Sequence, residues 1–332
     1  MDAKTASLAA EAAALLRGAE AVLVVSHANP DGDSVGTQLA LGRLLEDHAG
    51  EVVLLAADPV PSRYAWLPGT GKIRVVERCD RHYPVVVALE CANFERTGIA
   101  GISGDVVLNI DHHQQNDGYG TLNWVDPSFS SVGEMIYHVG RQLAGEKQLP
   151  LETAVGLYTA ILTDTGSFRF SNTSPDALAV SGKLVALGVE PAEVAAAVYE
   201  NHSAARLRLM GRVLSSLALD EECRIGWVAV RQADLAETGA EPQDVEGLVN
   251  LPKSIGELEV VALFREQPDG SFRVSLRSKR LVDVAAVAAR FGGGGHVRAA
   301  GLTVPGPLDG AATVVIGALR TAIGETPGND ER

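Results

Sequence analysis

The chain has 332 residues, of which 46% are hydrophobic and 21% are charged, and its net charge is −14. This length leaves room for about two globular domains, and no apolar run approaches the ~20 residues of a membrane-spanning helix. The negative charge argues against a protein that coats long nucleic acid through a wide basic surface. It is compatible with a small phosphate-bearing substrate.

The cysteines and the N-terminus indicate the compartment. Cys79, Cys91 and Cys223 are odd in number and lack metal-ligand spacing, so we predict neither a disulfide framework nor a zinc site. Residues 1–17 lack the basic start, apolar centre and cleavage site of a signal peptide. We therefore expect a cytoplasmic protein without membrane contact, and the sequence leaves a homodimer open.

The most informative stretch is an apolar run at residues 21–25 that is followed by His27, Asp31 and Asp33. The run predicts a buried strand. One imidazole and two carboxylates thus follow its carboxyl end, where open α/β sheets bind ligands. Nitrogen and hard oxygen ligands suit Mn²⁺, Co²⁺ or Mg²⁺. The alternative is that residues 29–32 form only a turn.

Two later apolar runs also end in polar residues. Residues 83–89 are followed by Glu90, and residues 105–110 are followed by Asp111, His112 and His113. The remaining predicted elements of this half are a strand at 51–57 and helices at 5–16, 34–47, 131–143 and 152–162. Strands that alternate with helices predict an α/β fold, with a parallel sheet and helices on both faces.

The second half of the chain has a different pattern. Residues 174–219 are predicted to be wholly helical, and β-like runs at 225–230, 258–264 and 272–276 precede a helix at 282–291. This order predicts a smaller α+β domain behind a helical connector. The predicted boundaries are 1–185 for the first domain, 186–219 for the connector, 220–326 for the second domain and 327–332 for a tail.

Eight acidic and histidine residues are predicted to meet at the strand ends. They are His27, Asp31, Asp33, Glu90, Asp111, His112, His113 and Asp164. Ligands at successive strand ends of one sheet are enough for two divalent ions, which together can activate water and clamp phosphoryl oxygens. Individually, Asp111 to His113 could be a surface turn, and Asp164 could cap a helix.

A glycine run, Gly292, Gly293, Gly294 and Gly295, precedes His296 in the second domain. It could be a hinge, or a backbone nest whose N–H groups bind phosphate. Residues 265–298 contain seven Lys or Arg and three acidic residues, a net charge of +4. The local charge favours an anion-binding role.

These motifs together resemble the DHH/DHHA1 phosphoesterases, the superfamily of RecJ-like exonucleases and family II pyrophosphatases. Residues 95–98, 163–169, 252–254 and 275–278 are similar to the branch of bifunctional oligoribonucleases and pAp phosphatases (nano-RNases). The resemblance implies an N-terminal DHH domain, a DHHA1 substrate-binding domain and two Mn²⁺ per chain, with Mg²⁺ or Co²⁺ as substitutes. One departure is Glu90, where the family usually has Asp as the metal-bridging carboxylate.

The resemblance also implies residue roles. The implied metal ligands are His27, Asp31, Asp33, Glu90, His112 and Asp164. The implied catalytic residues are Asp33, Asp111 and His113, of which His113 contacts the scissile phosphate. The implied substrate-binding residues are His113, Arg96, Ser131, Arg277, Gly292, Gly293, Gly294, Gly295 and His296.

The leading hypothesis is a Mn²⁺-dependent hydrolase that releases 5′-nucleoside monophosphates from very short RNA and dephosphorylates pAp. The same centre could cleave cyclic or linear dinucleotides. Pyrophosphate is a weaker candidate substrate because the predicted second domain is of the DHHA1 type. A rival from another class is a non-catalytic nucleotide sensor that has lost one metal through Glu90.

Overall fold

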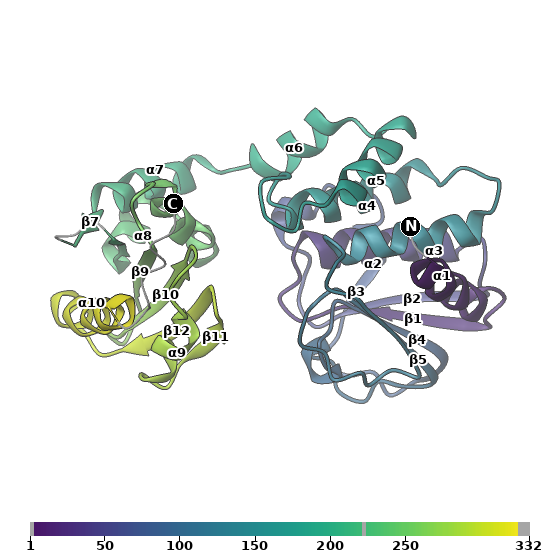
Figure 1. Ribbon diagram of the computed structural model, residues 1–332, viewed down its shortest axis with the longest axis horizontal. Coiled ribbons are helices and arrows are strands. Elements are labelled where there is room, and N and C mark those ends of the chain that lie inside the picture. Colours follow the sequence, from purple (N-terminus) through teal and green to yellow (C-terminus); the bar gives the residue numbers. More distant parts are fainter. Residues whose placement is uncertain (1–2, 221–223, 325–332) are drawn as a thin grey trace. The chain divides into compact units, whose positions relative to one another are not determined.

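The structure, a computed structural model, describes residues 3–220 and 224–324, with the backbone but not the side chain of His296. The chain divides into two compact units, Met1–Asn201 and His202–Arg332 (Figure 1). Cys223 lies outside the described residues, whereas Cys79 and Cys91 are buried free thiols.

The first unit is built on a six-stranded sheet. Its strands are β1 (Ala21–Val25), β2 (Glu51–Ala56), β3 (Ile73–Val75), β4 (His82–Leu89), β5 (Ser103–Asp111) and β6 (Leu122–Val125). The order is β3-β2-β1-β4-β5-β6, and all neighbouring pairs are parallel. This confirms the predicted parallel sheet. The order reverses between β1 and β4, and open α/β sheets bind ligands beyond the carboxyl ends of their strands at such a reversal.

Helices pack on one face of this sheet (Figure 1). They are α1 (Ala3–Leu16), α2 (Gly32–Leu45), α3 (Val132–Ala144), α4 (Leu151–Asp164), α5 (Pro175–Ala186) and α6 (Pro191–Tyr199). Their apolar side chains form one core with Val22, Val24 and Val87 of the central strands. Burial of these apolar surfaces supplies most of the driving force for folding.

The opposite face differs from the expectation of helices on both sides. Leu23, Val25 and Val86 pack there against connecting loops and the 3-10 helix η3 (Phe94–Thr97). The segment between β4 and β5 turns at Gly98 and Gly101, both with positive φ. Because these turns interrupt any helical run, the segment forms one short 3-10 helix instead of an α-helix.

Two glycines let α2 and α4 approach closely. A Cβ atom on Gly36 would lie 2.4 Å from the carbonyl oxygen of Gly156, and one on Gly156 would lie 2.6 Å from that of Gly36. A Cβ atom on Gly32, where α2 begins, would lie 2.3 Å from Oγ1 of Thr163 near the end of α4. This contact brings the loop before α2 next to Asp164.

The second unit has a mostly antiparallel sheet, in the order β11-β12-β10-β9-β8-β7. Its strands are β7 (Ala218–Leu219), β8 (Ile225–Val230), β9 (Val260–Glu266), β10 (Phe272–Ser278), β11 (Gly294–His296) and β12 (Ala299–Val304). Its helices are α7 (Ala204–Ser215), α8 (Gln232–Thr238), α9 (Val284–Ala289) and α10 (Leu308–Gly324), with short 3-10 helices at Pro242–Val245, Leu248–Asn250 and Pro252–Ser254. One core lies between the sheet and α9 and α10, and a second core involves α7 and α8.

Residues 174–219 are less uniformly helical than expected. The segment contains α5, α6 and α7, which are separated by breaks, and it ends in β7. Pro175 and Pro191 each start a helix, where the missing N–H of proline costs nothing. The division between the two units falls inside this segment, between α6 and α7. The strands β3, β6, β7, β11 and β12, as well as α8 and α10, were not predicted.

Candidate metal centre

The carboxyl ends of three neighbouring strands bring the predicted ligands together. Glu90 directly follows β4, Asp111 is the last residue of β5, and His27 comes two residues after β1. The strands lie in the order β1-β4-β5. Side chains that are 21 to 84 positions apart in the sequence therefore meet at one edge.

One group of potential ligands consists of His27, Asp31 and Glu90, each of which offers an atom within 4.8 Å of the others. Nε2 of His27 lies 3.9 Å from Oδ1 of Asp31 and 3.5 Å from Oε2 of Glu90. Asp31 also caps α2, since its Oδ1 accepts a hydrogen bond of 3.0 Å from the Ser34 amide. Asp31 therefore caps a helix and also belongs to a group of potential ligands.

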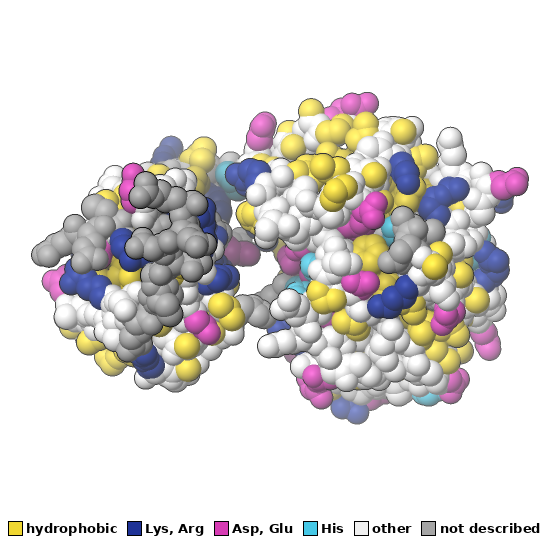
Figure 2. Space-filling view, viewed as in Figure 1, with side chains coloured by type: hydrophobic (Ala, Val, Ile, Leu, Met, Phe, Trp, Pro, Cys, Tyr) yellow, Lys and Arg dark blue, Asp and Glu magenta, His cyan; other side chains and the backbone are white. Residues whose placement is uncertain are grey.

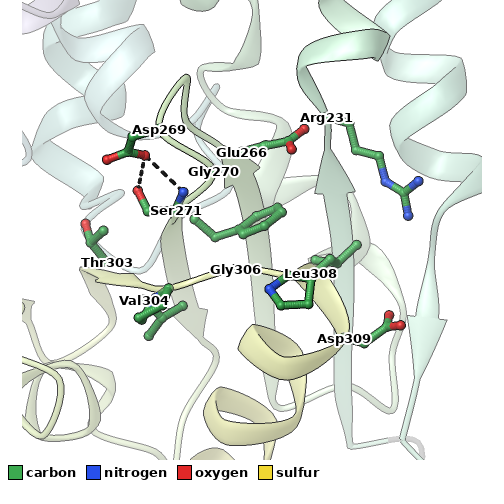
Figure 3. Close-up of a pocket in the computed structure, with 13 residues that line it drawn as sticks. Arg231, Glu266, Asp269, Gly270, Ser271, Thr303, Val304, Gly306, Leu308 and Asp309 are labelled. Atoms are coloured by element: carbon green, nitrogen blue, oxygen red, sulfur yellow. Dashed lines mark hydrogen bonds between the residues drawn. The ribbon is translucent and has the colours of Figure 1, made fainter.

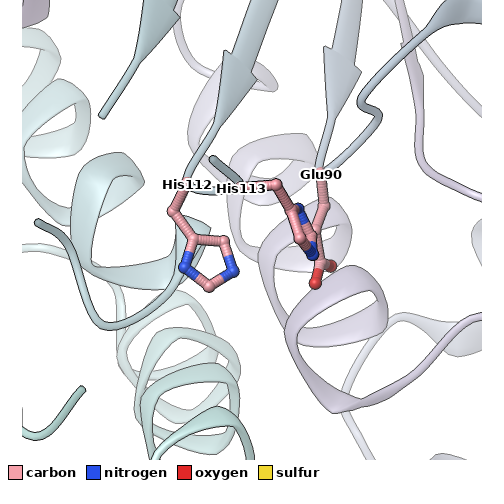
Figure 4. A group of neighbouring side chains, drawn as sticks. All are labelled: Glu90, His112 and His113. Atoms are coloured by element: carbon pink, nitrogen blue, oxygen red, sulfur yellow. The ribbon is translucent and has the colours of Figure 1, made fainter. Parts of the chain in front are cut away.

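A second group consists of Glu90, His112 and His113, whose ligand atoms also lie within 4.8 Å of one another (Figure 4). Glu90 belongs to both groups and is 3% exposed. Its backbone adopts a left-handed conformation with φ of 59°, which is uncommon for a residue with a side chain. A carboxylate between two ligand groups has the position of a bridge between two cations.

The two histidines are oriented by their Nδ1 atoms. Nδ1 of His112 lies 3.3 Å from the carbonyl oxygen of Phe129, and Nδ1 of His113 lies 2.7 Å from Oδ1 of Asp111. Both partners accept hydrogen bonds, so Nδ1 carries the hydrogen in each ring. A neutral ring then has Nε2 free as a ligand or a hydrogen-bond acceptor.

Asp111 is fully buried and serves the neighbouring His113. Its Oδ1 accepts hydrogen bonds from the amide and from Nδ1 of His113, and its Oδ2 accepts one of 2.7 Å from Asn116. Burial alone would raise the pKa of Asp111, but these hydrogen bonds lower it below its usual value. The hydrogen bond to Asp111 in turn raises the pKa of His113.

Asp33 is the second residue of α2, and its carboxylate lies at the N-terminus of α3. Its Oδ2 accepts a hydrogen bond of 2.7 Å from the amide of Val132, and its Oδ1 accepts one of 2.8 Å from that of Gly133. A carboxylate at a helix N-terminus satisfies free N–H groups and interacts favourably with the helix dipole. Burial raises the pKa of Asp33 despite these contacts. Oδ1 also accepts a hydrogen bond of 2.8 Å from Oγ1 of Thr37, so Oδ2 is the oxygen that keeps a lone pair for a further partner.

Asp164, the last residue of α4, joins the cluster from the helical layer. Its Oδ2 lies 3.7 Å from Nε2 of His112. Burial and the charges of Asp33 and Asp31 raise the pKa of Asp164 to about 8. The same cause acts on Glu90, since burial, followed by the charges of Asp31, Asp33 and Asp164, raises its pKa well above the usual value. The carboxylates thus lack compensating positive charge.

Divalent cations fit this donor set. The buried carboxylates repel one another, and a cation between them would stabilise their charged forms. Neutral imidazole nitrogens would serve as further ligands of this cation. In His27, Nδ1 lies 2.8 Å from the carbonyl oxygen of Ala28, and Nε2 lies 2.6 Å from Oγ of Ser34, which itself donates to Glu90. The carbonyl oxygen of Ala28 places a hydrogen on Nδ1, so Nε2 is the ring nitrogen that His27 would offer to a cation.

Two predicted substrate-binding residues of the first unit have different settings. Arg96 is exposed in η3, and its positive charge lowers the pKa of His113, which places it near the cluster. Ser131 is fully buried and caps α3, because its Oγ accepts a hydrogen bond of 3.1 Å from the Glu134 amide. The structure therefore gives Ser131 a capping role that explains its presence without a substrate.

The predicted anion-binding residues of the second unit lie at one end of its sheet. Arg277 pairs with Ala299 across β10 and β12, and Gly294 and Gly295 lie on the adjacent β11. The side chain of His296 lies outside what the structure describes. Lys253 lies near Arg277 and Lys279. Burial is the main cause that lowers the pKa of Lys253, and the charges of these two residues lower it further. Figure 2 shows basic side chains in dark blue on the visible face of this unit.

A pocket of about 880 Å³ occupies the other end of the same sheet (Figure 3). It is lined by Phe272 of β10 and Val304 of β12, which pair with each other at the strand ends opposite Arg277. Its charged lining residues are Arg231, Glu266, Asp269 and Asp309. Since three of these four residues are acidic, the pocket is poorly suited to bind an anion. It is distinct from the predicted anion-binding residues around Arg277.

Sequence reasoning missed three polar residues that support the cluster. Ser34 lies between His27 and Glu90, Glu134 binds the loop before α3, and Asn172 contacts Asp164. The serine follows Asp33 in the loop and could have been proposed from that position. Glu134 lies only four positions from its partner Ser130, so its role is local, whereas Asn172 carries no local signal because its partners Asp164 and Ser130 lie 8 and 42 positions away.

Comparison with known proteins shows the family of this chain. Residues 21–161 match the N-terminal domain of the DHH family, and residues 227–322 match the DHHA1 domain. The chain therefore belongs to the DHH/DHHA1 phosphoesterases, which confirms the resemblance drawn from the motifs. A Thermus thermophilus protein named bifunctional oligoribonuclease and PAP phosphatase NrnA is 35% identical over 90% of this chain and 89% of its own length.

Solved structures share the fold. An exopolyphosphatase-related protein from Bacteroides fragilis aligns with a TM-score of 0.86 and 25% identity over 95% of this chain and 96% of its own. RecJ from Thermus thermophilus in complex with Mn²⁺ aligns with a TM-score of 0.51 and 16% identity over 94% of this chain and 55% of its own. None of the helices within residues 3–220 and 224–324 has the length and apolar character needed to cross a membrane.

Proposed function

We propose that this phosphoesterase uses two Mn²⁺ ions to hydrolyse very short oligoribonucleotides to 5′-mononucleotides and to remove the 3′-phosphate of pAp. The observation that carries the proposal is the position of Glu90 in both ligand groups, because a carboxylate has two oxygens and can serve two neighbouring cations. The substrate class follows the relative from Thermus thermophilus, which is named for both activities and is similar along nearly the whole chain.

The proposed ligands divide between two ions. His27, Asp31 and Glu90 would hold the first ion, and Glu90 and His112, together with Asp164, would hold the second. Asp33 would be a further ligand. A mixture of imidazole and carboxylate ligands suits Mn²⁺ and admits Co²⁺ or Mg²⁺. When bound, two such ions lower the pKa of a shared water and neutralise phosphoryl oxygens.

The remaining residues act on the substrate. His113 presents Nε2 to the scissile phosphate, while Asp111 fixes the ring through Nδ1. Arg96 adds positive charge near His113. In the second unit the proposed substrate-binding residues are Arg277, the glycine run at 292–295 and His296. The cytoplasmic location remains a proposal from the sequence, which leaves a homodimer open.

Hydrolysis of a two-nucleotide RNA and of pAp tests the proposal. The metal-stripped protein should be inactive, and Mn²⁺ should restore release of mononucleotides and of inorganic phosphate. His112→Ala should remain folded and lose activity by orders of magnitude. Full activity in a chelator would overturn the metal mechanism. Equal rates per end on two-nucleotide and twenty-nucleotide RNA would overturn the assignment to short substrates.

A further inference from the structure

Asn172 joins two segments of the first unit that carry proposed ligands. Its Nδ2 atom lies 2.9 Å from the carbonyl oxygen of Ser130, 3.1 Å from that of Asp164 and 3.3 Å from Oδ2 of Asp164. All three are acceptors, so the amide nitrogen is assigned to this side by its surroundings. One side-chain amide thus links the end of α4 to the loop that precedes α3.

The chain makes a strained turn to bring Asn172 back to Asp164. Gly166, Ser167 and Phe168 have φ values of 55°, 61° and 61°, a left-handed run that is rare for residues with side chains. The turn is held by Thr165, whose carbonyl oxygen accepts from the amides of Arg169 and Phe170. Strain of this kind persists where surrounding contacts over-determine it, and it clusters at functional sites.

On the loop side, Ser130 is held from two directions. Its amide and its hydroxyl donate to Oε2 of Glu134 at 3.0 and 2.7 Å, and its carbonyl oxygen accepts from Asn172. Ser130 and Glu134 are both buried. The next residue towards the N-terminus, Phe129, supplies the carbonyl oxygen that contacts Nδ1 of His112. Fixing Ser130 therefore fixes the partner that orients His112.

We infer that Asn172 is a positioning residue that clamps Asp164 and, through Ser130 and Phe129, holds His112 in the orientation for cation binding. The inference rests on the proposed two-ion function of this site. Partners that orient metal ligands typically contribute 10- to 100-fold to metal affinity. Asn172 acts with the donor hydrogens of its amide, since its Oδ1 is buried without a hydrogen-bond partner among the described residues.

The adjacent Thr173 provides a matched control. Its Oγ1 is also buried without a hydrogen-bond partner among the described residues. Thr173→Val removes a polar group from the same segment without removing a bond to the cluster. Asn172→Leu removes the donors at similar volume, and Asn172→Gln keeps an amide that is displaced by one methylene.

The first measurement is Mn²⁺ binding by calorimetry. In Asn172→Leu one of two equivalents should bind about 10- to 100-fold more weakly, kcat at limiting Mn²⁺ should fall, and excess Mn²⁺ should restore it with little change in KM. The Mn²⁺ affinity of Asn172→Gln should lie between those of Asn172→Leu and the wild type. Thr173→Val should bind Mn²⁺ with wild-type affinity. Wild-type affinity for both equivalents in Asn172→Leu, or an equal loss in Thr173→Val, would overturn the inference.

The second measurement is amide hydrogen exchange in the metal-free protein, which does not depend on the proposed function. Faster exchange at residues 129–131 in Asn172→Leu than in Thr173→Val supports the clamp, and unchanged exchange there overturns it. If Asn172→Leu fails to fold, both measurements are made on Asn172→Gln, and wild-type Mn²⁺ affinity together with unchanged exchange in that variant overturns the clamp. A wild-type protein that binds no divalent ion refutes the proposed function, whereas wild-type binding with an unaffected Asn172→Leu refutes the clamp alone.

Discussion

Oε2 of Glu90 lies 3.5 Å from Nε2 of His27, and both atoms contact the hydroxyl of Ser34. In the metal-free protein at pH 8 the buried carboxyl group of Glu90 destabilises the fold. Its burial and the neighbouring carboxylates disfavour the charged form and so raise its pKa. Glu90→Gln should therefore raise the melting temperature of the metal-free protein, by about 2–4 °C per kcal/mol, while weakening metal binding. Glu90→Asp should bind metal better than Glu90→Gln. Two tightly bound Mn²⁺ in Glu90→Gln would show that Glu90 is no ligand.

Metal binding should stabilise the fold. A ligand that binds only the native state adds about 2.7 kcal/mol at 100 times its Kd, so Mn²⁺ should raise the melting temperature by several degrees and a chelator should reverse the shift. The exposed His82, which pairs with Asp105 at the opposite end of β4, provides the control. His82→Ala should keep the Mn²⁺-induced shift, and His112→Ala should lose most of it. Equal shifts in both variants would contradict the predicted site.

Asp111→Asn tests the orientation of His113. The carboxylate accepts from Nδ1 and from the amide of His113, and an asparagine side chain can accept through one oxygen only. We expect kcat to fall about 10- to 100-fold, as for other partners that orient a functional histidine, with two Mn²⁺ retained. Asp126→Asn, which alters a carboxylate bound to Ser128, should leave kcat unchanged. An unchanged kcat in Asp111→Asn would show that Asp111 does not orient His113 for catalysis.

The glycine contact between α2 and α4 makes a prediction about stability. Gly36→Ala should destabilise the protein by about 1–3 kcal/mol, because the added methyl overlaps the backbone of Gly156. Gly182 in α5 has open space around its Cβ position, so Gly182→Ala should stabilise by about 0.5–1 kcal/mol. Chemical denaturation of both variants measures the difference. A neutral Gly36→Ala would mean that the helices can separate at little cost.

His138 on α3 should make stability depend on pH. Burial lowers the pKa of His138 to about 4 from an ordinary value near 6.5. The unfolded chain therefore binds a proton that the folded chain does not, and this group weakens the fold as pH falls from about 6.5 to about 4. His138→Gln should lose less stability across that window than the wild type. Parallel denaturation curves for the two proteins at pH 7 and pH 5 would contradict the prediction.

The sequence by itself determined the parts of the site that are built locally. The buried run at Ala21–Val25 and the polar loop behind it specify strand, loop and helix through hydrophobic period and turn residues, so His27, Asp31 and Asp33 could be placed at a strand end. Glu90 and Asp111 follow from the same rule applied to β4 and β5. Because parallel strands align their carboxyl ends, their convergence could also be expected.

Only the tertiary structure decided how these residues share their contacts. The strand order placed Glu90 between His27 and His112, and helix packing turned Asp33 towards the amides of α3, 99 and 100 positions away. The left-handed turn after Asp164 brought Asn172 to the same edge. Such contacts depend on which surfaces bury each other across the whole unit. The energy of burial is not directional, so a local pattern specifies which residues are buried but not which distant partners they meet.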